Sequence, residues 1–152
     1  MQQSRGFQPI RVLLTAWLVL LLGACSVSDR EQQLRQQISA LQEAIDRRDV
    51  GDVEALLAED FVGNEGMDRR GARQLAAAVF LRHREVAARI GPVEVELRGQ
   101  DDAMARFPVL ATGGSGGLLP ERGQAYQVET GWRLVDGEWK LRNASWKPAL
   151  GQ

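Results

Sequence analysis

The sequence is short of cysteine and histidine, with one of each in 152 residues. One cysteine excludes a framework of disulfides within the chain, and together with one histidine it excludes a zinc site built from these residue types. Neither sign of charge dominates, because 19 lysines and arginines stand against 20 aspartates and glutamates. Nucleic-acid-binding proteins usually carry a surplus of positive charge, so this balance argues against one. The length and the hydrophobic share of 44% fit one globular domain.

Charge is also scarce at the N-terminus, where Arg5 and Arg11 are the only charged residues before Asp29. An apolar run over 12–22 follows them, interrupted only by Thr15. A helix of this length rises about 16 Å, whereas a bilayer core is roughly 30 Å thick, so the run is too short for an ordinary transmembrane helix. A basic start followed by such a run is typical of a secretory signal peptide.

The end of this run, Leu-Gly-Ala-Cys at 22–25, resembles a bacterial lipobox, in which an aliphatic residue and two small residues precede a lipidated cysteine. The resemblance implies that residues 1–24 are removed as a lipoprotein signal peptide and that Cys25 becomes the acylated first residue. Two or three acyl chains anchor a protein stably, since each buried CH₂ contributes about 0.8 kcal/mol. Ser26 follows, as in lipoproteins sent to the outer membrane. We therefore expect a cell-envelope lipoprotein that faces the periplasm, with residues 25–30 as a lipidated N-terminus and short tether.

Helical patterns fill the first half of the remaining chain. Ser28 and Glu31 form a capping box, and the apolar residues that follow at helical spacing predict an amphipathic helix that ends near Arg48. A break at 49–52 precedes a short helix that ends near Glu59. We expect the first helix to pack its apolar face on the core.

A third helix is predicted further along the chain. An extended piece at 60–63 ends in a turn, and Asp68 then stands in a position to cap the helix. The apolar stripe of this helix runs from Leu75 to Ile90, and Gly91-Pro92 has the order of residues that usually ends a helix. We therefore expect one helix between Asp68 and Gly91.

Beyond Pro92 the apolar residues alternate with polar ones, which is the pattern of a half-buried strand. A strand over 93–98 is followed by a turn at 99–102 and by a second strand over 103–111. Pro108 lacks a backbone N–H, so it predicts that the second strand lies at a sheet edge or carries a bulge.

Two further strands, over 124–135 and 138–146, are joined by Asp136-Gly137, and a two-residue link of this kind is typical of a β-hairpin. If Val135 faces Glu138 across the link, one face of the hairpin is apolar near the link and polar at its far end. We expect this face to cover the core and its polar end to form the mouth of a cavity. On this face, which also holds Tyr126, Leu134 pairs with Trp139, Trp132 with Leu141, Thr130 with Asn143 and Val128 with Ser145.

Three N-terminal helices packed on a curved antiparallel sheet form an α+β domain. The order of elements resembles the nuclear transport factor 2-like, or SnoaL-like, superfamily. The resemblance rests on the opening at 45–50 with Leu56-Leu57 and Asp60-Phe61, and on the ending Gly-Trp-Arg-Leu-Val-Asp-Gly-Glu-Trp-Lys-Leu at 131–141. It implies a cone-shaped domain over 31–148 with a pocket between helices and sheet, and many members dimerise through the sheet. The superfamily holds isomerases, dehydratases, epoxide hydrolases, transport factors and binders without catalysis, so the fold does not settle function.

Two residues are candidates for a general base. His83 lies four residues after Val79 and three before Val86, on the apolar stripe of the third predicted helix, where it faces either a pocket or the ordinary packing of a half-buried helix. Asp60 is a proton acceptor if it is desolvated and a plain turn residue if it is not. No catalytic motif of the superfamily matches residue by residue, so neither residue is assigned a role.

The polar residues of the inner face are candidates for ligand binding. Hydrogen bonds from them orient a small ligand in an apolar pocket, or else they pair across the strands and fill the end of the sheet. Trp132 is first a core residue and second a platform for a ligand. No histidine and carboxylate stand at metal-ligand spacing, and no cofactor motif is present, so we expect neither a metal nor a cofactor. The polar candidates are Tyr126, Thr130, Asn143 and Ser145.

Three functions remain open. The first is a membrane-anchored accessory domain that binds a small apolar ligand without catalysis. The second is a small hydro-lyase or isomerase that acts on an apolar substrate, with His83 or Asp60 as the general base. The third is a module for protein interaction that forms a homodimer through its sheet.

Overall fold

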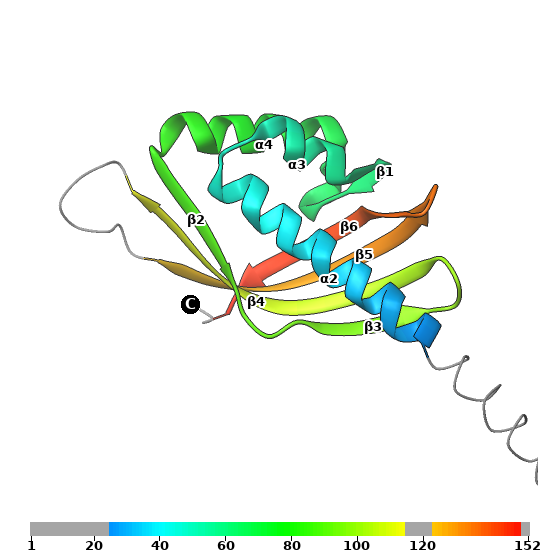
Figure 1. The fold of residues 1–152 in the computed structure, drawn as a ribbon. Helices are drawn as coiled ribbons and strands as arrows, with labels where there is room; N and C mark the ends of the chain where they lie inside the picture. Colours follow the sequence, from blue (N-terminus) through cyan, green and yellow to red (C-terminus); the bar gives the residue numbers. More distant parts are fainter. Residues whose placement is uncertain (1–24, 115–122, 150–152) are drawn as a thin grey trace, which may run out of the picture.

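The computed structural model describes residues 25–114 and 123–149 of the chain. The predicted fold class, three helices packed on a curved sheet, is confirmed, although one strand of the sheet precedes the third helix. Helices α2 (Cys25–Asp46), α3 (Val50–Leu56) and α4 (Arg69–Arg82) form one layer, which lies over one face of a curved sheet (Figure 1). The predicted signal peptide at 1–24 lies outside the described residues.

Helix α2 starts earlier than its predicted cap. It begins at Cys25, so Ser28 lies inside the helix rather than before it. No glycine or proline stands between these residues to stop the helix from extending toward the N-terminus. Arg30 is already part of the folded domain, because its guanidinium donates to the carbonyl of Gln100 at 2.6 Å and its own carbonyl accepts from the Trp139 indole at 3.2 Å.

Helix α3 also starts earlier than predicted, inside the expected break at 49–52. Asp49 is its N-cap, and the Asp49 carboxylate accepts from the backbone N–H of Asp52 at 3.0 Å. A side-chain cap of this kind starts a helix although a glycine, Gly51, stands in the first turn. The helix ends at Leu56, and Leu57 is the first residue of a strand, β1 (Leu57–Val62).

The cap of helix α4 is confirmed, because Asp68 accepts from the backbone N–H of Gly71 at 2.7 Å. The predicted end at Gly91 is wrong, since the helix stops at Arg82 and a strand, β2 (Glu85–Ile90), follows. The apolar residues in this stretch fit a helix and a strand equally well. Hydrogen bonds to a neighbouring strand decide the outcome, and a local pattern does not contain them.

The other elements are the 3₁₀ turn η1 (Asn64–Gly66), β3 (Glu94–Arg98), β4 (Asp102–Gly114), β5 (Gln124–Val135) and β6 (Glu138–Pro148). The sheet has the order β1-β6-β5-β4-β2, and β3 pairs with β4 as well. All neighbours are antiparallel except β1, which pairs with β6 in parallel and makes the sheet mixed.

Pro108 does not lie at an edge of the sheet. Strand β4 has β5 on one side, and on the other side it pairs first with β3 and then with β2. Pro108 stands at the junction of these two, where its carbonyl accepts from the backbone N–H of Gly91 at 2.9 Å. A Cβ on Gly91 would lie 2.7 Å from Pro108 Cγ, so the corner between β2 and β3 needs a glycine.

The predicted hairpin is confirmed at its turn. Asp136 and Gly137 have φ values of 51° and 83°, as a tight two-residue turn requires. Val135 pairs with Glu138, Leu134 with Trp139 and Trp132 with Leu141, as expected from the sequence.

Beyond Trp132 the predicted register is wrong, because a β-bulge inserts one extra residue in β6. Thr130 pairs with Ala144 instead of Asn143, and Val128 pairs with Trp146 instead of Ser145. A shift by one residue moves every later side chain to the opposite face.

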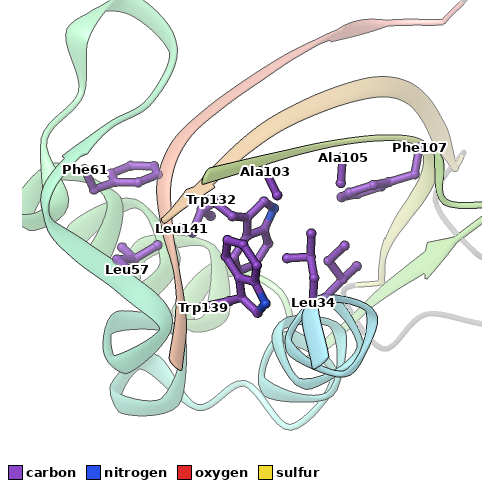
Figure 2. Close-up of a cluster of buried hydrophobic side chains, with 10 residues drawn as sticks. Leu34, Leu57, Phe61, Ala103, Ala105, Phe107, Trp132, Trp139 and Leu141 are labelled. Atoms are coloured by element: carbon purple, nitrogen blue, oxygen red, sulfur yellow. The ribbon is translucent and has the colours of Figure 1, made fainter. Parts of the chain in front are cut away.

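The core lies between α2 and the sheet. Trp132 and Trp139 are each 1% exposed and lie next to each other between α2 and the sheet, near Leu34 (Figure 2). The indole nitrogen of Trp132 donates to the hydroxyl of Thr130 at 2.9 Å, so its buried polar group is satisfied. Among the described residues, the strands and the core residues lie between Leu34 and Pro148, so this part of the chain has a core of its own.

Candidate functional site

A cavity of about 420 Å³ lies between the helical layer and the inner face of the sheet. Its size is within the range of small-molecule sites, roughly 300–1,000 Å³. Leu75 on α4 lines the cavity and is 46% exposed, so the cavity reaches the surface beside this helix. The lining consists of Leu41, Ile45, Val53, Leu57, Phe61, Met67, Ala72, Leu75, Ala76, Val79, Phe80, Val86, Ala88, Ile90, Phe107, Val109, Ala111, Tyr126, Val128, Thr130, Leu141, Ala144 and Trp146.

Small side chains leave this space open. Alanines stand at lining positions on four elements that surround the cavity, and an alanine fills much less volume than the leucines and tryptophans of the core beside it. Two of them lie four residues apart on α4, which brings them to the same face of the helix. These alanines are Ala72 and Ala76 on α4, Ala88 on β2, Ala111 on β4 and Ala144 on β6.

Among the described residues, the lining carries no charged side chain, and its polar groups are few. They are the hydroxyls of Tyr126 and Thr130 and the indole N–H of Trp146, beside the sulfur of Met67. A site of this composition holds an apolar molecule by contact and has few groups that can exchange a proton with it.

Thr130, predicted to bind a ligand, lies in the cavity wall and is 2% exposed. Its hydroxyl donates to the carbonyl of Ala105 at 3.0 Å and accepts from the Trp132 indole at 2.9 Å. The hydrogen of this hydroxyl is therefore already used inside the protein. The main role of Thr130 is therefore to connect the wall of the cavity to the core.

Tyr126, also predicted, lines the cavity near the start of β5. Its hydroxyl donates to the Oε1 of Gln124 at 2.8 Å, and Gln124 is exposed. Trp146 on β6 is the neighbour that the register shift brings to the same face. Within the described residues its indole nitrogen forms no hydrogen bond, and it is not one of their buried atoms without a partner, so it stays accessible.

Three other predicted ligand residues do not line the cavity. Asn143 and Ser145 are exposed on the outer face, because the bulge in β6 turns them away from the inner one. Trp132 is buried in the core, where its side chain packs with Trp139 rather than with a cavity. The side chains that replace them in the lining are Ala144 and Trp146.

Neither candidate general base reaches the cavity. His83 is the residue after α4 rather than a residue on its apolar stripe, and its Nδ1 is buried with no hydrogen-bond partner in the described part of the chain. Asp60 lies beside the buried Phe61 on β1, and alternation along a strand turns it to the opposite side. Its carboxylate, 56% exposed, forms ion pairs with Arg133 at 3.2 Å and Arg142 at 3.6 Å.

The outer face of the sheet is charged. Arg106 forms ion pairs with Glu129 at 2.7 Å and with Glu96 at 3.7 Å. The hydrogen bond and charge of Glu129 raise the pKa of Arg106 above its usual value. These exposed pairs keep the outer face polar and contribute little to stability.

Part of the lining was not predicted. Met67 packs against Gly63 and Gly71, where a Cβ on either glycine would lie 2.9 Å from a Met67 side-chain atom. No pattern in the sequence points to Met67, whereas Trp146 belongs to the predicted hairpin and was missed only through the bulge.

Other kinds of site find no support in the part of the chain that the structure describes. Within it, no group of three or more histidine, cysteine, aspartate or glutamate side chains is placed to hold a metal ion. Among the same residues, no helix has the length and hydrophobicity to cross a membrane.

Three solved structures illustrate what the fold is similar to. A proposed scytalone dehydratase from Novosphingobium aromaticivorans has 17% identity and a TM-score of 0.73, over 80% of this chain and 85% of that chain. A proposed dehydratase of the nuclear transport factor 2-like family from Streptomyces avermitilis has 19% identity and a TM-score of 0.72, over 83% of this chain and 100% of that chain. A nuclear transport factor 2-like superfamily protein from Salmonella enterica has 13% identity and a TM-score of 0.71, over 84% and 96%.

Identities this low establish a shared fold alone. Among curated proteins, none matches the chain. A family model described as the SnoaL-like domain matches residues 26–145, which include almost every described element. The chain therefore belongs to the SnoaL-like domain family.

Proposed function

We propose that this chain is a lipid-anchored lipoprotein of the bacterial cell envelope whose SnoaL-like domain binds a small apolar molecule without transforming it. The observation that carries the binding function is the cavity of about 420 Å³, to whose lining the described part of the chain contributes no charged side chain. Burial of apolar surface contributes roughly 25 cal/mol per Å², so such a cavity favours hydrocarbon over any ion.

Absence of catalysis is supported by the position of the candidate bases. A general base must lie within hydrogen-bond reach of its substrate, directly or through one water. His83 and Asp60 lie outside the lining, and Tyr126 is the single titratable side chain within it. Two structural neighbours are named as proposed dehydratases, but neither His83 nor Asp60 lines the cavity in which such a substrate would lie.

Anchoring at Cys25 is supported by the lipobox-like residues at 22–25 and by the helix that starts at Cys25. Leu41 and Ile45, which line the cavity from α2, lie about 24 Å and 30 Å along the helix from Cys25, at 1.5 Å per residue. An acylated Cys25 then holds the cavity at a short and fixed distance from the membrane surface. A homodimer through the outer face is a separate proposal, and its charged surface favours a polar contact.

The anchor is tested by fractionation of cells that produce the native chain or Cys25→Ser. We expect the native chain in the membrane fraction and carrying acyl mass on Cys25, and the variant to lose both. The contrary result is a Cys25→Ser chain whose leader has been removed and whose share in the membrane fraction equals that of the native chain. This result contradicts the anchor.

Binding is tested by native mass spectrometry of the protein purified from its own cells. We expect a small apolar molecule bound to the native chain. Ala76→Phe fills the cavity, so we expect this variant to carry no bound molecule. Ala78→Phe, on the exposed side of the same helix, retains the bound molecule. Ala144→Leu on β6 fills the opposite wall and serves if Ala76→Phe does not fold. A native chain with no bound molecule, or a molecule retained equally by the filled variants, contradicts the proposal.

A further inference from the structure

The cavity has a polar end, and it selects the chemistry of the ligand. Resting on the proposed function, we propose that the ligand is an uncharged molecule with a hydrocarbon body and one hydrogen-bond-accepting group, such as a ketone, ester or ether oxygen. The accepting group lies at Tyr126 and Trp146, and the hydrocarbon body fills the remainder of the cavity.

The two residues of the polar end are neighbours on the inner face. Tyr126 pairs with Pro148, and Trp146 pairs with Val128, so Tyr126 and Trp146 stand diagonally across β5 and β6. Diagonal positions of a strand pair are about 7–8 Å apart and within reach of aromatic side chains. One ligand oxygen can therefore contact both side chains.

Both residues supply hydrogen-bond donors. The indole N–H of Trp146 is a donor only. It forms no hydrogen bond within the described residues and is not one of their buried unpartnered atoms, so it is accessible to a ligand. The Tyr126 hydroxyl donates to the exposed Gln124 side chain, and this hydroxyl rotates to suit a better-placed acceptor. The polar end therefore offers two hydrogen-bond donors, and the oxygen acceptors that face it are hydroxyls. This composition favours a ligand that accepts a hydrogen bond.

The rest of the lining disfavours a charged ligand. Among the lining residues that the structure describes, a carboxylate finds no cation and an ammonium group finds no anion, since none of their side chains is charged. Lys147 follows Trp146 in the chain, but it lines the groove on the outer face with Arg106. An ion that enters therefore loses its hydration without a counter-charge, which disfavours binding strongly.

The volume limits the size of the ligand. A cavity of about 150 Å³ holds one benzene ring, so the 420 Å³ available here hold roughly 15 carbon atoms. A bicyclic aromatic skeleton or a medium-length chain is of this size.

Three naphthalenes of nearly equal shape test the proposal. They are 2-acetylnaphthalene with a ketone, 2-ethylnaphthalene without a polar group, and 2-naphthoate with a carboxylate. Binding to residues 25–152 carrying Cys25→Ser, which contain the whole described domain, is measured by equilibrium dialysis at pH 7. We expect the ketone to bind about five-fold tighter than the hydrocarbon, as one net hydrogen bond provides, and at least ten-fold tighter than the carboxylate.

Two variants assign the polar end. Tyr126→Phe and Trp146→Phe, each checked for a native-like thermal transition, are expected to reduce the preference for the ketone over the hydrocarbon to less than two-fold. The ratio of the two affinities is the readout, because a merely structural role weakens both ligands alike and leaves that ratio unchanged. A control, Ser145→Ala on the outer face, leaves both unchanged.

The outcomes separate the two proposals. If none of the three compounds binds, the proposed function is overturned, and this inference with it. If 2-naphthoate binds as tightly as 2-acetylnaphthalene, or if neither variant reduces the preference for the ketone, the cavity binds apolar molecules but the assignment of its polar end is wrong.

Discussion

Gly131 and Asn143 face each other across β5 and β6 so closely that a Cβ on Gly131 would lie 2.1 Å from the Oδ1 of Asn143. The amide of Asn143 occupies the space that any larger residue at 131 would need. This pair stands at the bulge, where the register of the hairpin changes by one residue. The bulge then directs Ala144 and Trp146 into the cavity, so the shape of the site depends on a contact on the opposite face of the sheet.

Gly131→Ala tests this relationship. The new methyl group forces the Asn143 side chain to leave its position, and we expect a loss of about 1–2 kcal/mol in the free energy of unfolding, measured by urea denaturation. Asn143→Ala removes the obstacle, so the double variant regains most of that loss. Additive effects in the double variant contradict the steric explanation.

Thr130→Val is expected to destabilise the domain. Valine keeps the shape of threonine, but it leaves the buried indole N–H of Trp132 without an acceptor, which costs about 1–3 kcal/mol. Thr130→Ser keeps the hydroxyl and is the matched control. Urea denaturation of both variants measures the difference, and equal stability of Thr130→Val and the native chain is the contrary result.

Arg48→Met is expected to weaken the end of α4. The guanidinium of Arg48 donates to the carbonyls of Phe80 and Arg84 and so satisfies backbone groups that the helix end leaves free. We expect a loss of about 1 kcal/mol in unfolding free energy. Arg47→Met, next in the chain, removes only exposed ion pairs and serves as the control, with a loss below about 0.5 kcal/mol.

Asp60→Asn and His83→Gln are expected to leave ligand binding unchanged. Neither side chain lines the cavity, and Asp60 forms only exposed ion pairs. The amount of small molecule that co-purifies with each variant, measured by native mass spectrometry, should equal that of the native chain. Loss of the molecule from either variant, with the fold intact, would show that the replaced residue contributes to binding.

Patterns within a few residues of one another are determined by the sequence alone. The cap at Asp68 and the turn at Asp136-Gly137 follow from the chemistry of single residues, and both are observed. The pairing of Trp132 with Leu141 near the turn follows from that turn, because a tight turn sets the register of the first residues on either side.

Pairing between distant residues was decided by the tertiary structure. Whether 85–90 continues a helix or forms a strand depends on hydrogen bonds to β4, whose paired residues lie 19 to 29 positions further along the chain. The parallel pairing of β1 with β6 is of the same kind. No local pattern contains such partners, so periodicity alone does not predict them.

Most of the site likewise depends on pairing between distant residues. The sequence showed that the inner face of the hairpin has a polar end, and it identified Tyr126 and Thr130 there. One extra residue in β6, held against Gly131, exchanged Asn143 and Ser145 for Ala144 and Trp146 in the space below the helices. The alternation of a strand has a period of two residues, so a single insertion reverses every side chain beyond it, and only the packed sheet shows where that insertion lies.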